Sequence, residues 1–290
     1  MLALICGAGA LPAQVARALD APPIVCALQG FAPDGLTPEI TFRIETLGSL
    51  IAWLKARGVT ALCLCGHIRR PQIDITTLDA ATAPLVPRLK QAMELGDDGA
   101  LRVVLALFAE AGFEILAAHE AAPDLLPPPG VPTRAQPPEG VRDAAQAGDA
   151  EIARLAAADA GQACVIRDGR VVASEGPDGT DAMLAGLTRP EADDPFSWAV
   201  DRVDDVLGQA ADWLSNASPA PAFLFKAPKP GQDRRADLPV IGPGTAAALA
   251  RAGLSGAVIE AGGVMVLDRA RTIADFDAAG LFLWVRERPA

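Results

Sequence analysis

The segment Leu2-Ala3-Leu4-Ile5-Cys6-Gly7-Ala8-Gly9-Ala10-Leu11-Pro12 joins a short apolar run to a glycine turn and then to an amphipathic run. An uninterrupted apolar run of this length is typical of a strand buried on both faces of a parallel sheet. Proline suits the first turn of a helix, because its φ is fixed near the helical value and an N–H there has no helical partner. The segment therefore predicts a strand, a tight turn and a helix, the beginning of a βαβ unit.

The same alternation continues along the first half of the chain. Apolar runs at residues 23–28, 60–65 and 113–117 alternate with helical patterns at 12–19, 47–57, 85–93 and 97–111. Short strands separated by amphipathic helices indicate a parallel sheet that is covered by helices. We therefore expect the α/β fold class, with a Rossmann-like parallel-sheet domain over residues 1–125.

Residues 126–140 are rich in proline and glycine, which excludes a regular helix and favours an extended, semi-rigid linker. Beyond this linker, residues 141–290 mix helical patterns with short strands. The Asp168-Gly169 pair between two β-branched runs is a strong hairpin signal. We expect a C-terminal mixed α/β (α+β) domain over residues 141–290 that carries catalytic and substrate-binding groups.

The composition limits the classes of function. The net charge is −11 without any basic run, which disfavours nucleic acid as a partner and electrostatic docking on anionic lipid. No segment reaches the roughly 18 uncharged apolar residues that a membrane span needs. The five cysteines lie in apolar runs, where thiols behave as small hydrophobic groups, so we expect a reducing, cytoplasmic location. With two histidines and no tyrosine, the chemistry must rest on carboxylates, Lys, Arg and backbone amides.

The first glycine turn is a candidate phosphate contact. Gly7 and Gly9 let backbone amides approach a phosphate at a helix N-terminus, which begins with Leu11 and Pro12. The dinucleotide fingerprint is incomplete, because Pro12 replaces its third glycine and Gln29 stands where an acid would hold a ribose. NAD is therefore not expected. A nucleotide or sugar-phosphate contact and a tight turn without any ligand both remain open.

Two further turns in the first half carry charge. Arg69 and Arg70 follow the third predicted strand, where open α/β sheets bind ligands, and guanidinium groups suit bidentate contacts with phosphate. The alternative is a solvated basic loop. Asp97 and Asp98 stand at the start of a long predicted helix. They either cap the helix and stabilise it through a favourable interaction with its dipole, or they contact a metal or substrate.

A glycine turn in the second half gathers three carboxylates and a hydroxyl. Glu175, Asp178 and Asp181 surround this turn at the end of a predicted strand, together with Thr180. Carboxylate oxygens are suited to a hard cation, although the spacing matches no EF-hand loop. The alternative is that Thr180 or Asp181 caps the helix that follows.

The stretch from Lys226 to Pro243 reads KAPKPGQDRRADLPVIGP, in which prolines and glycines stiffen a loop crowded with charge. A binding or catalytic site requires such preorganised groups, whereas a solvated surface loop does not. Lys229, Arg234 and Arg235 could neutralise phosphates, while Asp233 and Asp237 could bind a metal or activate water. The composition alone thus predicts a phosphate-handling site.

These segments together resemble the LpxI family of UDP-2,3-diacylglucosamine pyrophosphatases. The matching segments are residues 7–12, 66–71, 96–98, 161–162, 175–183, 226–242, 252–254 and 260–262. The string Lys-Ala-Pro-Lys-Pro-Gly-Gln-Asp, which ends at Asp233, is the most specific of them.

The resemblance implies hydrolysis of UDP-2,3-diacylglucosamine to UMP and 2,3-diacylglucosamine 1-phosphate, called lipid X, in lipid A biosynthesis. It also implies a Mg²⁺ cofactor, with Mn²⁺ as an alternative, and a homodimer. By the family pattern Asp233 is the first choice for a catalytic residue. In the mechanism that we expect, Lys229 and Arg234 stabilise the charge on the phosphates. The expected metal ligands are Asp233, Glu175, Asp178 and Asp181. The expected substrate contacts are Gly7, Gly9, Leu11, Pro12, Arg69, Arg70, Gln162, Thr180, Lys226 and Gln232.

Residues 189–219 form a longer connection than the family pattern implies, and their apolar residues fall at helical spacing. This segment is an extra helix packed on its domain, a wall for acyl chains, or a peripheral contact with the cytoplasmic face of the inner membrane. Its acidic residues argue against a contact with anionic headgroups. Two other functions remain open: a non-catalytic sugar-nucleotide or lipid-phosphate binding protein, and a nicotinamide-dependent oxidoreductase, which Gln29 disfavours.

Overall fold

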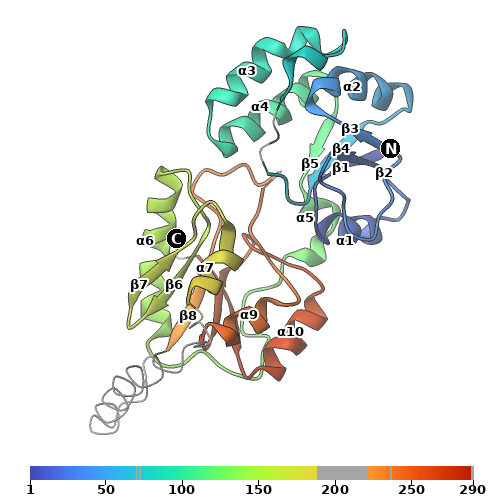
Figure 1. Ribbon diagram of the computed structural model, residues 1–290. Coiled ribbons are helices and arrows are strands. Elements are labelled where there is room, and N and C mark those ends of the chain that lie inside the picture. The colour runs from blue at the N-terminus through green and yellow to red at the C-terminus, as the bar shows by residue number, and fades with distance from the viewer. Residues whose placement is uncertain (70, 72, 188–220, 236, 289–290) are drawn as a thin grey trace, which may run out of the picture. The chain divides into compact units, whose positions relative to one another are not determined.

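The structure is a computed structural model that describes residues 1–69, 71, 73–187, 221–235 and 237–288 (Figure 1). The chain divides into two compact units. The N-terminal unit comprises Met1–Pro128, Pro228–Gly242 and Gly262–Arg269, and the C-terminal unit comprises Pro129–Ala227, Pro243–Ala261 and Ala270–Ala290. The chain therefore passes between the units several times.

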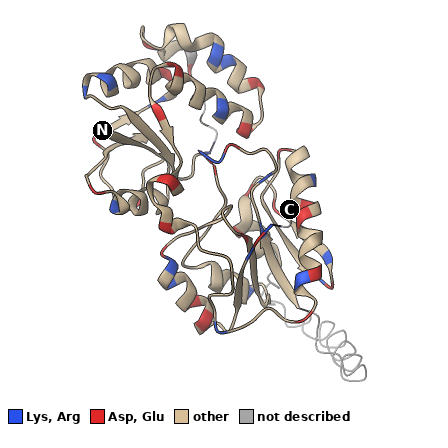
Figure 2. Ribbon diagram, turned by 180° about the vertical axis from the view of Figure 1, so that it is seen from behind, with Lys and Arg blue, Asp and Glu red and all other residues tan. Residues whose placement is uncertain are grey.

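The N-terminal unit is built on a five-stranded parallel sheet in the order β3-β2-β1-β4-β5. Its strands are β1 (Leu2–Cys6), β2 (Ile24–Leu28), β3 (Ile40–Phe42), β4 (Ala61–Cys65) and β5 (Glu114–Leu116). This is the strand order of a Rossmann-like sheet, so the predicted fold class is confirmed. Figure 2 shows charged residues on the helices of this unit and none on the central strands β1, β2 and β4.

Helices cover both faces of this sheet. The α-helices are α1 (Leu11–Ala18), α2 (Leu47–Ala56), α3 (Val86–Glu94), α4 (Asp97–Glu110) and α5 (Ala118–Ala121), and the 3₁₀ turns are η1 (Ile44–Thr46), η2 (Ile75–Thr77), η3 (Ala83–Leu85) and η4 (Pro123–Leu125). Alternate residues of a strand point to opposite faces. Ile5 and Leu62 therefore pack with α2, α3 and α4, whereas Leu4 and Cys63 pack with α1 and α5.

Two segments from the second half of the sequence complete the N-terminal unit. Strands β9 (Val240–Ile241) and β11 (Met265–Val266) form a two-stranded parallel sheet. Leu238 and Met265 are buried in the same cluster as Leu4 and Cys6. We expected residues 141–290 to form one contiguous domain, but this apolar packing places 228–242 and 262–269 with the N-terminal unit.

The C-terminal unit has a five-stranded mixed sheet in the order β12-β10-β8-β6-β7. Its strands are β6 (Ala163–Arg167), β7 (Arg170–Ser174), β8 (Ala222–Lys226), β10 (Gly256–Glu260) and β12 (Phe282–Arg286), and its helices are α6 (Val141–Ala157), α7 (Gly179–Leu187), α9 (Thr245–Arg251) and α10 (Arg269–Ala278). Strands β8, β10 and β12 are parallel, and β6 runs antiparallel to both β8 and β7. Asp168 and Gly169 have φ values of 53° and 69°, as the predicted hairpin turn requires.

The proline-rich segment predicted as a linker is extended and attached to the C-terminal unit. Gly130 exchanges two backbone hydrogen bonds with Val285 of β12, at 3.0 and 2.8 Å. The Thr133 hydroxyl accepts a hydrogen bond from the Leu283 N–H at 2.9 Å. The segment thus covers the outer edge of β12, where backbone groups would otherwise lack partners.

The five cysteines are free and buried. Burial raises the pKa of Cys26 and of Cys164 to about 12, so these thiols stay protonated. Within the described parts of the chain, no helix has the length and apolar content to cross a membrane. The helix predicted at 189–219 lies outside the described residues.

Candidate active site

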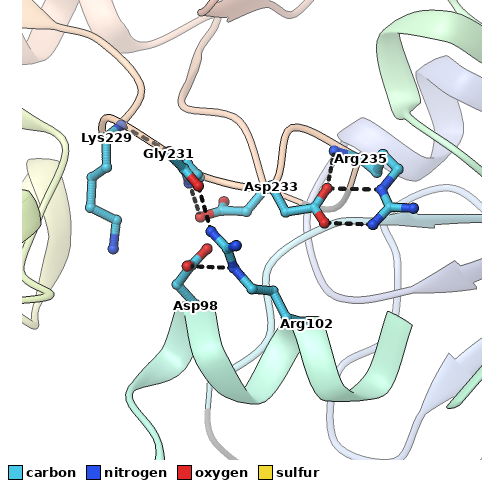
Figure 3. A network of polar contacts seen from close by, with 8 residues as sticks. Asp98, Arg102, Lys229, Gly231, Asp233 and Arg235 are labelled. Atoms are coloured by element: carbon cyan, nitrogen blue, oxygen red, sulfur yellow. Dashed lines mark hydrogen bonds and ion pairs between the residues drawn. The ribbon is translucent and has the colours of Figure 1, made fainter. Parts of the chain in front are cut away.

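Asp233 lies in a loop of the N-terminal unit, residues 228–237, here called the site loop, and its carboxylate is bound by Arg235 (Figure 3). The Oδ1 atom accepts hydrogen bonds from the Arg235 backbone N–H at 3.1 Å and from its Nε at 3.0 Å. The Oδ2 atom accepts one from Nη2 at 2.7 Å. These contacts with Arg235 lower the pKa of Asp233, against the opposing effect of burial. The Asp233 carboxylate is therefore ionised at neutral pH.

Gln232 is buried and holds the two ends of the site loop together. Its Oε1 accepts a hydrogen bond from the Lys229 backbone N–H at 2.9 Å, and its Nε2 donates to the Asp237 carboxylate. Its own N–H donates to the Lys229 carbonyl at 3.1 Å. We predicted a substrate contact at Gln232, and the structure shows its side-chain amide engaged within the loop at both ends.

Two cations of the site loop reach different surroundings. Arg234 is exposed, and its Nη1 donates to the Gly262 carbonyl at 3.1 Å, which connects the loop to the segment before β11. Lys229 is half-buried, and its side chain extends away from Arg235 (Figure 3). The loop therefore presents positive groups on both sides of the ionised Asp233.

Helix α4 contacts the site loop through Arg102 (Figure 3). The Arg102 Nη2 donates to the Gly231 carbonyl, two residues before Asp233. The Arg102 Nε donates to Asp98 Oδ2 at 2.9 Å. We considered Asp98 as an N-terminal acid of the helix or as a metal or substrate contact, and did not consider Arg102. The i, i+4 spacing of the two residues was the signal that could have linked them.

Helix α5 places His119 and Glu120 within electrostatic range of Arg234 and Arg235, respectively. Burial lowers the pKa of His119, the charge of Glu120 opposes this shift, and the charge of Arg234 adds to it. The Nδ1 atom of His119 is buried and has no hydrogen-bond partner in the described structure. Sequence reasoning missed both residues, although they follow β5 at the edge of the sheet where ligands bind.

The glycine turn after β1 is braced against the loop after β4. The Gly7 N–H donates to the Cys65 carbonyl at 2.9 Å, and Ala8 and His67 exchange two backbone hydrogen bonds of 2.8 Å. A Cβ on Gly7 would lie 2.5 Å from the His67 carbonyl oxygen, so this close approach requires glycine. The Gly7 and Ala8 amides are thus engaged within the protein. Gly9 adopts a φ of 94°, which favours glycine in the same turn.

The remaining predicted contacts of the N-terminal unit differ in exposure. Leu11 and Pro12 are buried at the start of α1, where Leu11 packs in the core with Leu4. Arg69 is exposed, and Arg70 lies outside the described residues. Leu11 and Pro12 therefore have a packing role, whereas the Arg69 side chain is accessible to solvent.

The C-terminal unit brings four predicted site residues together in one chain of hydrogen bonds. The Lys226 Nζ donates to the Thr180 hydroxyl at 2.9 Å, and this hydroxyl donates to Glu175 Oε1 at 2.6 Å. Glu175 Oε2 accepts a hydrogen bond from the Gln162 backbone N–H at 2.5 Å. Lys226 is buried, so the hydroxyl and the carboxylate offset the cost of removing its charge from water.

Gly161 permits this arrangement, because a Cβ there would lie 2.4 Å from the Cβ of Glu175. Asp178 and Asp181, by contrast, are exposed. Among the residues that the structure describes, no group of three or more His, Cys, Asp or Glu side chains is placed to hold a metal ion together. Asp233 belongs to the N-terminal unit and the other three acids predicted as ligands belong to the C-terminal unit, so a shared metal site stays a prediction.

Comparison with known proteins places both parts of the chain in one family. Residues 1–125 match the LpxI N-terminal domain, and residues 128–284 match the LpxI C-terminal domain. The chain is also 38% identical, over 97% of its length and 96% of the relative's, to the UDP-2,3-diacylglucosamine pyrophosphatase LpxI of Caulobacter vibrioides.

Proposed function

Because this chain belongs to the LpxI family, we propose that it is a UDP-2,3-diacylglucosamine diphosphatase. It hydrolyses the pyrophosphate of its substrate to UMP and 2,3-diacylglucosamine 1-phosphate, or lipid X, in lipid A biosynthesis. Water attacks one phosphorus and the bond to the bridging oxygen breaks. The observation that carries the proposal is the family match, which includes the rigid loop around the ionised Asp233.

The residues of the site loop fit the demands of phosphoryl chemistry. Catalysis of this reaction depends mainly on positioning and on stabilising charge at the phosphate oxygens. Lys229 and Arg234 supply positive charge from the same loop as Asp233. A general base works best when its pKa lies near the working pH, and the pKa of Asp233 is lowered from its usual value. Asp233 is therefore better suited to binding a cation or orienting water than to removing a proton.

Asp233 also fits a Mg²⁺ ligand. Its carboxylate is ionised, its side chain is 16% exposed, and Oδ2 accepts one hydrogen bond, so that atom has a second lone pair available. Glu175 accepts one hydrogen bond at each of its oxygens, from Gln162 and from Thr180, so by the same count it also has lone pairs available for a cation. Mg²⁺ commonly uses one or two carboxylates and completes its shell with water and substrate phosphates. When bound, the ion supplies positive charge to the phosphate oxygens.

We assign the remaining substrate contacts by charge and by hydrogen-bonding groups. In the C-terminal unit, Lys226 and Thr180 present an ammonium and a hydroxyl, and Gln162 presents an amide beside them in the hydrogen-bonded chain. In the N-terminal unit, the exposed Arg69 is a phosphate ligand. Lys226 is held by Thr180, so its ammonium is preorganised.

We also propose that the protein acts as a homodimer at the cytoplasmic face of the inner membrane. The membrane contact is supported by the chemistry of the substrate, whose two acyl chains reside in a bilayer. The homodimer is what membership of the family implies. Sedimentation with vesicles that contain the substrate tests the membrane contact, and light scattering tests the dimer. A monomer that stays in the supernatant would refute both.

The decisive experiment is incubation of the purified protein with UDP-2,3-diacylglucosamine and Mg²⁺, followed by measurement of UMP. We expect UMP release that stops with EDTA and returns with Mg²⁺ or Mn²⁺. Asp233→Asn, which keeps the shape of the side chain and removes its charge, should lower turnover by about 10²-fold or more. Retention of the substrate without UMP would instead identify a binding protein, and full turnover in EDTA would refute the metal.

A further inference from the structure

Arg102 connects two parts of the N-terminal unit that are 129 residues apart in sequence. Its guanidinium donates from Nη2 to the Gly231 carbonyl and from Nε to Asp98 (Figure 3). The planar fork of arginine allows both contacts at once in a fixed geometry, which a lysine ammonium could not reproduce.

The bond to Gly231 fixes one peptide group of the site loop. The carbonyl of the Gly231–Gln232 peptide accepts from Arg102, and its N–H donates to the Lys229 carbonyl at 3.1 Å. Gly231 has a φ of 76°, a left-handed conformation that favours glycine. A peptide group that is bound on both sides cannot rotate freely. It is separated from Asp233 by Gln232 alone, so it limits the backbone conformations from which the Asp233 side chain can start.

Asp98 orients Arg102. The two residues lie one helical turn apart in α4, and the Arg102 Nε is 2.9 Å from the Asp98 Oδ2. Asp98 lies in the first turn of the helix, where the helix dipole favours a carboxylate. The helix itself is anchored by Leu105 and Phe108, which are 1% exposed in the core. The ion pair therefore orients Arg102 on α4, and Arg102 in turn holds the site loop at Gly231.

We infer that Asp98 and Arg102 are positioning residues, which hold the Gly231–Gln232 peptide and thereby place the Asp233 carboxylate for the reaction. The inference rests on the proposed function. The side chain of Arg102 is 49% exposed, and exposed ion pairs contribute little to stability. A purely structural pair at this place would thus affect the fold slightly and the reaction hardly at all, which distinguishes the two roles.

The test compares Arg102→Gln, Arg102→Lys and Asp98→Asn with a matched control. Arg88 of α3 pairs with Glu110 of α4 at 2.9 Å, and its side chain is 39% exposed, so Arg88→Gln removes another exposed ion pair that involves α4. We expect Arg102→Gln to lower kcat by about 10- to 100-fold with little change in KM, because small displacements of a reacting group have effects of this size. The kcat values of Arg102→Lys and Asp98→Asn should fall between those of Arg102→Gln and the wild type. The kcat of Arg88→Gln should match that of the wild type.

Amide hydrogen exchange provides a readout that does not depend on activity. In Arg102→Gln the amide of Gln232 should exchange severalfold faster, while the core amides and the melting temperature stay as in Arg88→Gln. If the wild type released no UMP, the proposed function would fail and exchange would still test the contact. Unchanged exchange at Gln232, or a kcat equal to that of Arg88→Gln, would overturn the inference.

Discussion

Asp233 and Arg235 form a bidentate ion pair, with Oδ2 2.7 Å from Nη2 and Oδ1 3.0 Å from Nε. A single residue separates the two, so one turn of the loop contains both the acid and the cation that lowers its pKa. The Arg235 side chain is 49% exposed, whereas that of Asp233 is 16% exposed, so the cation is the more solvated partner. The pair keeps the carboxylate charged and aligned before any ligand binds.

Arg235→Gln should move the acidic limb of the pH–rate profile. Arg235 is the largest cause of the lowered pKa of Asp233, so its removal lets that pKa rise toward the usual value. If ionised Asp233 is required, kcat/KM in the variant will fall at a higher pH than in the wild type. The measurement is kcat/KM as a function of pH from acid to neutral.

Arg271→Gln is the control for this profile, because Arg271 is 68% exposed on α10 and its removal changes the net charge equally. Its acidic limb should coincide with that of the wild type. Coincident limbs for Arg235→Gln would mean that the ionisation of Asp233 does not govern the rate.

Thr180→Val should destabilise the C-terminal unit. The hydroxyl accepts a hydrogen bond from Lys226 and donates one to Glu175, so its loss leaves two charged groups without this partner. A lost contact of this kind costs about 1–3 kcal/mol in the free energy of unfolding. Thr180→Ser keeps the hydroxyl and should remain near the wild type in urea denaturation. Equal midpoints for the Val and Ser variants would show that the hydroxyl contributes nothing.

Gly161→Ala should be more harmful than the same change at Gly186. The new methyl group at 161 would lie 2.4 Å from the Glu175 Cβ, whereas at Gly186 the described residues place no atom within 4 Å apart from the chain neighbours and the helix's own backbone. Overpacking of this kind costs about 1–3 kcal/mol. At Gly186, within α7, alanine should instead stabilise by roughly 0.5–1 kcal/mol, because it has the higher helix propensity. Thermal unfolding of both variants would reveal this difference in sign, and two similar values would contradict it.

His119→Gln should weaken the dependence of stability on mild acid. The pKa of His119 is lowered by burial, opposed by Glu120 and reinforced by Arg234, so the unfolded chain takes up this proton at a higher pH than the native protein. Native stability is therefore lost as the pH falls through the unfolded value of about 6.5 toward the lowered native one. The variant should lose less stability between pH 7 and pH 5.5 in urea titrations.

His67→Gln is the matched control for this titration, because His67 is the other histidine of the chain and is exposed. If the free energy of unfolding fell by the same amount between pH 7 and pH 5.5 in the wild type and in His119→Gln, the pKa of His119 would not be lowered in the native protein.

The regular elements could be predicted because their sequences carry a strong local signal. The apolar runs of β1 and β4, the helical pattern of α4 and the Asp168-Gly169 hairpin were placed within one or two residues. The prediction omitted β3, β9 and α5. These elements have only three, two and four residues, too few for a period to be visible, and long-range pairing and packing hold them in place.

Within the site, sequence reasoning identified residue types but could not assign their partners. Gln232 and Asp233 were both selected from one string, yet Gln232 shapes the loop whereas Asp233 presents an ionised carboxylate. Arg102 was overlooked, because nothing in the sequence shows that α4 lies against residue 231.

The sequence by itself determined the α/β fold class, the hairpin, the stiffness of the charged loop and the resemblance to one family. These properties depend on short-range periodicity, on glycine and proline, and on strings of neighbouring residues. Only the tertiary structure decided that residues 228–242 pack with the N-terminal unit and that Arg102 contacts Gly231. It also decided that Glu175 is occupied by Thr180 and Gln162. Such contacts join residues distant in sequence, and burial of apolar surface in the folded chain selects them.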